Sequence, residues 1–313
     1  MAIAHNPHAP HSTDAQDAGK SSAAASNMAR RARRQAFMFS LLRVAAAINI
    51  MALFGICGFL LWNGLPAISW EFLTAPPRAA MTEGGIWPAI VGTILLAVGA
   101  LSVSFPLGVA SAVYLHEYAH HSRFARYIRV GVANLAGVPS IVFGLFGMAF
   151  FVIYCGLGIS LLSGILTLAV LTLPVIISTS EEALRQVPGT YREASLALGA
   201  TQSQTIVRVV LPAALPSMLT GAILALARAA GDTAAIMFTA VVFFTPREVD
   251  SLLSPVMALS NHMYVLATAG MDIEKTRPLQ YGTALVLITL VLSMNLLAIV
   301  LRDRLRSKAA RGL

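Results

Sequence analysis

Long apolar stretches, free of Asp, Glu, Lys and Arg, follow one another along the chain. They cover residues 44–70, 84–116, 130–180, 209–227 and 278–301. Because about 20 apolar residues in a helix cross a bilayer, each stretch predicts at least one membrane span. At ~1.5 Å per residue, the third stretch would exceed twice the ~30 Å hydrocarbon thickness, so it must hold two spans. The Cys-Gly-Leu-Gly segment at 155–158 is the natural turn between them.

This pattern predicts an all-α polytopic membrane protein. Six spans are expected, at about 41–63, 86–115, 130–153, 159–179, 211–244 and 280–301. The transmembrane domain is predicted to cover 37–307, with a loop at 181–210, a disordered basic tail at 1–36 and a short tail at 308–313. The composition agrees, since 57% of the residues are hydrophobic and 12% are charged, against about 25% charged in an ordinary soluble domain.

Basic residues gather on one side of the predicted topology. An even number of spans places both termini on one side, and both tails and the loops after the second and fourth spans carry most of the Lys and Arg. The opposite side holds only Arg78, Arg247, Lys275 and Arg277. The positive-inside rule then predicts cytoplasmic termini. Nucleic-acid binding is the poorer explanation of the +8 net charge, because no basic run is interleaved with aromatic residues.

The sequence contains no Gly-x-x-x-x-Gly-Lys-Ser/Thr loop to hold ATP phosphates. We therefore expect no ATPase activity, catalytic residue, cofactor or metal site in this chain. An ion-coupled carrier needs carboxylates buried in its spans, and only Asp232 lies in a predicted span. Such a carrier is the weaker interpretation, and a membrane sensor without transport is a third.

The loop at 181–210 carries the signals of two short helices. Thr190 with Glu193, and Thr201 with Gln204, each fit a capping box that begins a helix. Gly199 lies between them, where a left-handed residue would end the first helix. The prediction is a short αα-hairpin.

Apolar side chains are expected on the exposed side of this hairpin, away from the bilayer. They are Tyr191, Leu198 and Ile206. A plain connector is the alternative, but most connections need only ~4–6 residues, and an exposed apolar patch is typical of a binding surface.

The spacing within the loop resembles the coupling loop of type I ABC importer permeases. The matching residues are Glu193-Ala194-Ser195, then Gly199, then Val-Val-Leu-Pro at 209–212. Ser195 and Val209 are mild departures from the family's Ala and Ile. The resemblance implies a bundle of about six helices in a bacterial inner membrane, with Glu193, Ala194, Ser195 and Gly199 docked on an ATPase. The implied partners are a second permease subunit, two cytoplasmic ATPase subunits and an extracytoplasmic binding protein.

Three further segments resemble the phosphate-specific permeases of that family. They are residues 84–93, 136–147 and 226–235. The resemblance implies inorganic phosphate as the cargo, and sulfate, molybdate or phosphonate is the alternative. Asp232 stands where the family usually has Glu, so the charge is kept on a shorter side chain.

Arg228 is the only basic residue in the interior of a predicted span, and its planar guanidinium suits an oxyanion. Asp232 lies one helical turn further on, where pairing would offset the cost of burying Arg228; a purely structural ion pair is the alternative. Together with Thr233 and Ser140, these residues form the expected substrate pathway. Pro139 and Ser140 either interrupt their span toward a cavity or make a packing kink.

Overall fold

The structure is a computed structural model that describes residues 12–78, 81, 83–119, 122–245, 249–268 and 273–311. The chain divides into two compact units, Met1–Phe59 and Leu60–Leu313. The predicted extracytoplasmic residue Arg247 lies outside the described residues, as do the side chain of Lys275 and residues 1–11 and 312–313 of the predicted tails.

The first unit consists of most of helix α1 (Ser12–Gly64). The prediction of a disordered tail is wrong for residues 12–36, which are helical. This segment is rich in alanine and lacks proline, and both features favour a helix. The apolar pattern of the segment is weak and did not indicate this helix. At the other end of the chain, α12 likewise continues through most of the predicted C-terminal tail, to Arg311.

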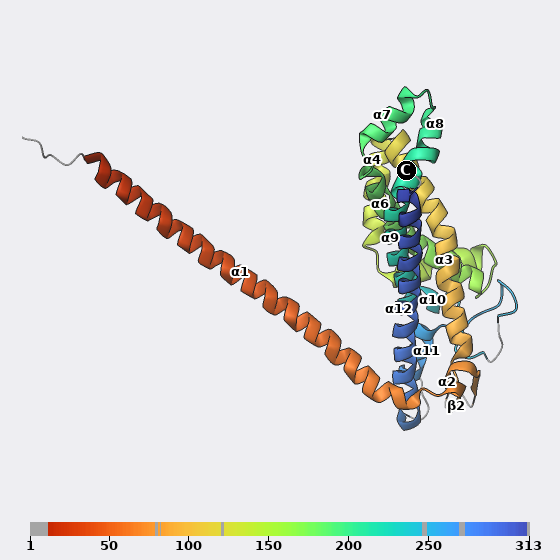
Figure 1. Ribbon diagram of the computed structural model, residues 1–313. Coiled ribbons are helices and arrows are strands. Elements are labelled where there is room, and N and C mark those ends of the chain that lie inside the picture. Colours follow the sequence, from red (N-terminus) through yellow and green to blue (C-terminus); the bar gives the residue numbers. More distant parts are fainter. Residues whose placement is uncertain are drawn as a thin grey trace, which may run out of the picture. The chain divides into compact units, whose positions relative to one another are not determined.

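The second unit is almost entirely helical (Figure 1). Its first part contains η1 (Leu65–Ala67), α2 (Trp70–Thr74), β1 (Pro77–Arg78), β2 (Glu83–Gly84), α3 (Trp87–Val113), the π-helical η3 (Tyr114–Tyr118), α4 (Arg123–Ala136), α5 (Ser140–Gly147) and the π-helical η4 (Met148–Tyr154). Its second part contains α6 (Leu161–Arg185), α7 (Gly189–Ala197), α8 (Gln202–Thr205), the π-helical η5 (Ile206–Val210), α9 (Leu211–Gly231), α10 (Ala234–Met237), α11 (Leu259–Thr268) and α12 (Ile273–Arg311). The two strands pair antiparallel, with Pro77 opposite Gly84.

The structure contains span-length helices for five of the predicted spans, and the segment of the third predicted span is bent. Within the described residues, five helices are long and apolar enough to cross a membrane: Arg34–Ala67, Trp87–Tyr118, Leu161–Arg185, Gln202–Gly231 and Thr276–Arg304. The pair Arg123–Ala136 and Ser140–Tyr154 passes the same test together and is bent by 104°. The break falls at Pro139, which disfavours helical geometry in the residue before it. The helix is therefore interrupted between Ala136 and Ser140.

Helix α6 lies at the centre of the packing in the second unit. Its side chains Leu168 and Ile176 are fully buried, and it runs along α3 and α9. Small residues allow this close approach: a Cβ atom at Gly99 of α3 would overlap the side chain of Ile165 of α6. Van der Waals packing of this kind drives helix association where lipid replaces water.

The fifth span is shorter than the predicted range 211–244. Helix α9 ends at Gly231, and Asp232 takes an extended conformation with φ −75° and ψ 128°. Between the short helix α10 and α11, the described residues 238–245 and 249–258 form no helix, and Val241 and Val256 form an isolated bridge. The apolar character of these residues misled the prediction, because buried loops and helices are equally apolar.

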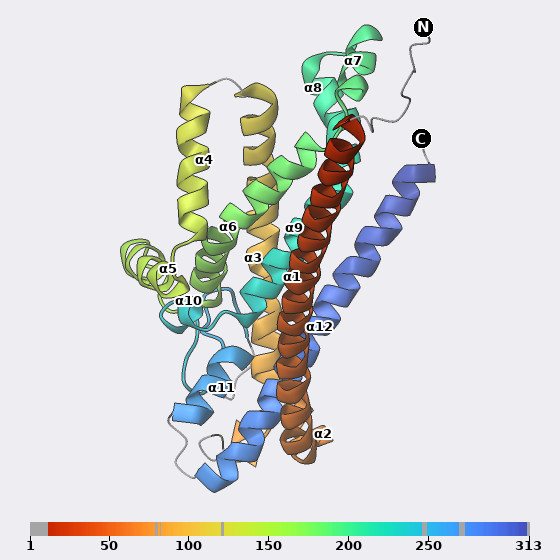
Figure 2. The ribbon, with the colours of Figure 1, turned by 90° about the vertical axis from the view of Figure 1, so that its left-hand side faces the viewer.

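The hairpin of α7 and α8 lies at one end of the second unit. Figure 2 shows that α3 ends, α4 begins and α12 ends toward this same end, while α2 and α11 lie at the opposite end. We call these the hairpin end and the far end of the unit.

Candidate functional site

The hairpin begins differently from the prediction. Helix α7 starts at Gly189, directly after Pro188, and no side chain caps it. The predicted capping box of Thr190 and Glu193 is therefore wrong, because Thr190 already lies inside the first turn. A side chain caps a helix from the N-cap position, and here Pro188, which has no side-chain acceptor, occupies that position.

The turn between the two helices agrees with the prediction. Gly199 has φ +83°, the left-handed conformation that ends a helix. The Thr201 hydroxyl accepts a hydrogen bond from the Gln204 backbone, and the Gln204 side chain accepts one from the Thr201 backbone, which completes the capping box. The hydroxyls of Ser195 and Thr205 lie 2.9 Å apart and join the two helices.

The outer face of the hairpin is exposed. Glu193 and Ala194 are both exposed, and Tyr191 and Leu198 have exposed fractions of 46% and 88%. The prediction of an exposed Ile206 is wrong, since Ile206 is 4% exposed. It belongs to η5, which leads into α9, and faces the bundle.

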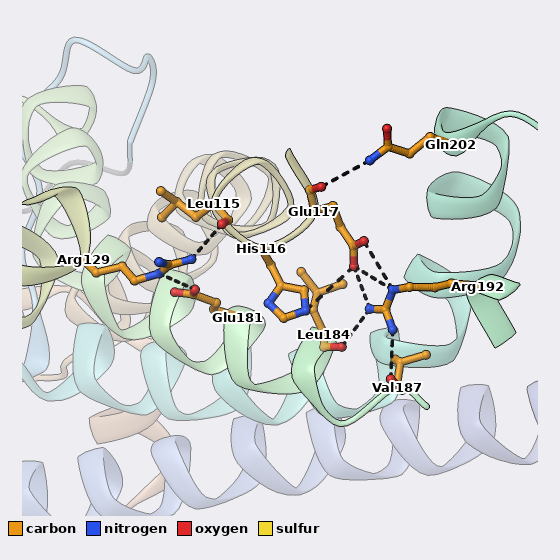
Figure 3. A network of polar contacts seen from close by, with 9 residues as sticks. All are labelled: Leu115, His116, Glu117, Arg129, Glu181, Leu184, Val187, Arg192 and Gln202. Atoms are coloured by element: carbon orange, nitrogen blue, oxygen red, sulfur yellow. Dashed lines mark hydrogen bonds and ion pairs between the residues drawn. The ribbon is translucent and has the colours of Figure 1, made fainter. Parts of the chain in front are cut away.

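One ion pair ties the hairpin to the end of α3 (Figure 3). The carboxylate of Glu117, in η3, accepts a hydrogen bond from Nη2 of Arg192, in α7, at 2.7 Å, and both of its oxygens lie 3.3 Å from Nε of Arg192. Arg192 also donates to the backbone oxygens of Leu184 and Val187, which end α6 and begin the connection to α7. Arg192 thus holds η3, the end of α6 and the start of α7 against one another.

A second ion pair supports the other side of η3. The Nε group of Arg129, in α4, donates to Glu181 of α6 at 2.6 Å, and its Nη2 group donates to the backbone oxygen of Leu115 at 2.7 Å. The two pairs lie beside each other at the hairpin end (Figure 3). The side chains of Glu117 and Glu181 are 9% and 10% exposed, so both carboxylates depend on these partners.

No sequence motif marks the four charged residues of these two ion pairs. Arg129 and Arg192 counted only toward the charge asymmetry. A signal was present: Glu117 and Glu181 directly follow two of the apolar stretches, and Arg129 directly precedes one. That position marks the polar end of a span but does not indicate which residues pair.

The predicted ion pair between Arg228 and Asp232 is wrong. Among the described residues, neither side chain forms an ion pair. The Asp232 carboxylate accepts a hydrogen bond from the backbone N–H of Ala235 at 2.8 Å instead. Because α9 ends at Gly231, Asp232 no longer follows the helical spacing that would place it over Arg228.

Two of the segments that carry the expected substrate-pathway residues pack against each other after the end of α9. Asp232 and Thr233 connect α9 to α10, and both are half-buried, as are Arg228 and Ser140. Ser140 is the first residue of α5, and α5 packs directly on α10, since a Cβ at Gly144 would lie 2.7 Å from the backbone oxygen of Ala234. The structure therefore brings the segments of Ser140 and Asp232 side by side, although they lie far apart in the sequence.

Comparisons with known proteins agree on the family. A family model described as the binding-protein-dependent transport system inner membrane component matches residues 104–311. The chain is 34% identical to the probable ABC transporter permease protein YqgI of Bacillus subtilis, covering 82% of the chain and 90% of that protein. It is 34% identical to the phosphate transport system permease protein PstA of Xylella fastidiosa, covering 83% and 93%. It is 37% identical to PstA 1 of Mycobacterium tuberculosis, covering 70% and 71%.

Solved structures confirm the fold predicted from the coupling loop. A chain of a bacterial alginate ABC transporter, crystallised with a periplasmic protein bound to an alginate pentasaccharide, superposes with a TM-score of 0.59 at 14% identity, covering 87% of this chain and 94% of that one. A chain of the inward-facing MetNI methionine ABC transporter gives a TM-score of 0.53 at 22% identity, covering 71% and 94%.

Proposed function

Because this chain belongs to the family of binding-protein-dependent transport system inner membrane components, we propose that it is the permease subunit that carries inorganic phosphate in an ATP-driven importer. The chain is a multi-pass inner-membrane protein whose transport is driven by a separate ATPase subunit. Its similarity to phosphate permeases over most of its length supports phosphate as the cargo.

The structural observation that supports an oxyanion cargo is that Arg228 has no acidic partner among the described residues. It lies in the span Gln202–Gly231, half-buried, and no acidic side chain in the described part of the chain neutralises it. A cation at membrane depth is costly and is usually kept for function. Its guanidinium offers a planar set of donors to phosphate oxygens, and no carboxylate competes for them.

The residues around Arg228 supply the rest of the proposed pathway. Thr233 and Ser140 contribute hydroxyl groups, which donate to oxyanions without adding charge. Asp232 holds the loop between α9 and α10 through its bond to Ala235. The carboxylate thus shapes the break, and Arg228 meets the anion.

Coupling to ATP is assigned to the hairpin. Glu193, Ala194, Ser195 and Gly199 would dock in a cleft of the ATPase, where the exposed side chains of Tyr191 and Leu198 are covered. The complete transporter would contain a second permease subunit of the PstC type, two cytoplasmic ATPase subunits of the PstB type and an extracytoplasmic phosphate-binding protein of the PstS type. Both termini and the hairpin would face the cytoplasm.

Uptake in membrane vesicles tests this proposal. Vesicles with the chain and its partner subunits receive labelled phosphate or labelled sulfate, with and without ATP. We expect uptake of phosphate that requires ATP and the binding protein. Uptake of sulfate alone would identify another oxyanion as the cargo, and uptake driven by an ion gradient without ATP would contradict the importer assignment.

A further inference from the structure

Few contacts hold the hairpin in place. Helix α7 has no buried residue, and the only buried residue of α8 is Thr205. Apolar packing therefore contributes little to the position of these two helices, and polar contacts to the rest of the unit must supply the remainder.

Glu117 supplies contacts to both helices of the hairpin. Its carboxylate pairs with Arg192 of α7, and its backbone oxygen accepts a hydrogen bond from the Gln202 side chain of α8 at 3.2 Å (Figure 3). The neighbouring Tyr118 hydroxyl lies 3.3 Å from the Ser203 hydroxyl, also in α8. The hairpin is thus attached to the last turn of one helix.

The opposite end of α3 reaches the proposed pathway. The Thr93 hydroxyl, 2% exposed, accepts a hydrogen bond from the backbone N–H of Leu259 at 2.9 Å. The next residue, Ser260, donates its hydroxyl hydrogen to the backbone oxygen of Asp232 at 3.1 Å. Gly92 permits this contact, because a Cβ there would overlap the backbone oxygen of Met257.

Helix α3 continues without a break through η3, and the two together connect the sites at their ends. We propose that Glu117 and Thr93 are positioning residues that make α3 the link between the coupling hairpin and the break after α9. A displacement of the hairpin would move α3 along its axis, and Thr93 would move the segment that holds Asp232. This inference rests on the proposed function, since it describes how ATP hydrolysis reaches the pathway.

The pair of Glu117 and Arg192 suits this role because it resists separation. The side chains are 9% and 22% exposed, and parting them would leave a buried carboxylate with only His116 beside it, 4.0 Å away. A half-exposed surface pair would instead exchange with water at little cost.

Two substitutions test the two ends of α3 in the complete transporter. Glu117→Gln keeps the shape and removes the charge, and Thr93→Val keeps the shape and removes the hydroxyl. The controls are Glu182→Gln, an exposed glutamate paired with Arg185 one turn away, and Thr289→Val, an exposed threonine bonded within its own helix. For each variant, phosphate taken up per ATP hydrolysed is measured together with hydrogen exchange of the backbone amides at 199–205.

We expect a different result at each end. Glu117→Gln should speed amide exchange in the hairpin and lower uptake per ATP about three- to ten-fold. Thr93→Val should lower uptake per ATP over the same range. It should leave amide exchange in the hairpin unchanged, because it removes only the hydrogen bond to Leu259 at the opposite end of α3. Both controls should match the wild type.

Wild-type uptake per ATP in either variant would overturn the proposal, as would a loss of assembled transporter at unchanged uptake per ATP. If Glu117→Gln does not reach the membrane, Glu117→Asp takes its place, since it keeps the charge and shortens the reach. If the wild type carries no phosphate, the proposed function fails. The link is then decided by hairpin exchange and by the stimulation of ATP hydrolysis by the binding protein, which do not require phosphate as cargo.

Discussion

The carboxylate of Asp232 lies 2.8 Å from the backbone nitrogen of Ala235 and accepts its hydrogen bond across the start of α10. The same side chain forms no ion pair with Arg228. The roles of these two residues are therefore separable by mutation.

For Asp232, we expect the acceptor oxygen to matter more than the charge. Asp232→Asn keeps an acceptor for Ala235 and should leave assembly and uptake near wild type. Asp232→Ala removes this acceptor and should destabilise the protein by ~0.5–2 kcal/mol, the usual cost of losing a side-chain acceptor at a helix start. Thermal unfolding of the purified complex measures this difference. Normal assembly with abolished uptake in Asp232→Asn would instead show that transport uses the negative charge.

For Arg228, we expect loss of transport without loss of assembly. Arg228→Gln strands no buried carboxylate, so the amount of transporter in the membrane should not change. Uptake should fall about 10- to 100-fold, since hydrogen bonds to charged groups contribute ~1.5–3 kcal/mol. Arg228→Lys keeps the charge but loses the planar fork and should lie between these values.

The control for Arg228 is Arg208→Gln, which removes an exposed arginine of the same span near the hairpin. Labelled-phosphate uptake, normalised to the transporter detected in the membrane, compares the two. Equal uptake in Arg228→Gln and Arg208→Gln would remove Arg228 from the pathway.

Gly199 tests the conformation of the hairpin turn. A Cβ at this position meets no atom of this chain within 4 Å, so within the chain a larger residue acts through φ, which is +83°. Gly199→Val should cost at least ~1 kcal/mol in the turn and misplace α8. Uptake coupled to ATP hydrolysis should drop while the protein still inserts into the membrane. Gly189→Ala in α7, which also meets open space but has no positive φ, should behave as wild type.

The topology follows from the charge asymmetry and the turn at 155–158. A reporter fused after Gly158 should appear outside the cytoplasm, and one fused after Gly199 should appear inside. Accessibility of the two reporters in intact cells measures this. Both reporters on the same side would contradict a topology of six spans.

His262 predicts a loss of stability in acid. It lies in α11, 4% exposed, and its Nδ1 has no hydrogen-bond partner among the described residues. Burial lowers the pKa of His262 from 6.5 to about 4. Between these pH values the unfolded chain binds a proton that the folded chain does not, so stability falls as the pH drops, by up to ~3 kcal/mol.

His262→Gln should weaken this dependence. The melting temperature of the solubilised complex, measured at pH 7 and pH 5, should fall less in the variant than in the wild type. An equal fall in both proteins would mean that other groups cause the acid sensitivity.

The sequence by itself determined the features that depend on neighbouring residues. The five straight spans each follow from one continuous apolar stretch, and the turn at 155–158, the left-handed Gly199 and the capping box of Thr201 with Gln204 follow from residues within a few positions of one another. Apolar length, turn conformation and capping are local properties, and the membrane imposes the helical state on every apolar stretch.

The tertiary structure decided which distant groups meet. Arg192 faces Glu117 from 75 positions away, and Ser260 reaches the backbone of Asp232 from 28 positions away. The same holds for the end of α9 at Gly231 and the burial of Ile206. A charged residue at the end of a span needs a partner of opposite charge. The sequence around it does not show which helix end will lie beside it in the folded protein. That choice depends on the packing of the whole bundle, because burial makes a charge pair costly to break only after the helices have brought its members together.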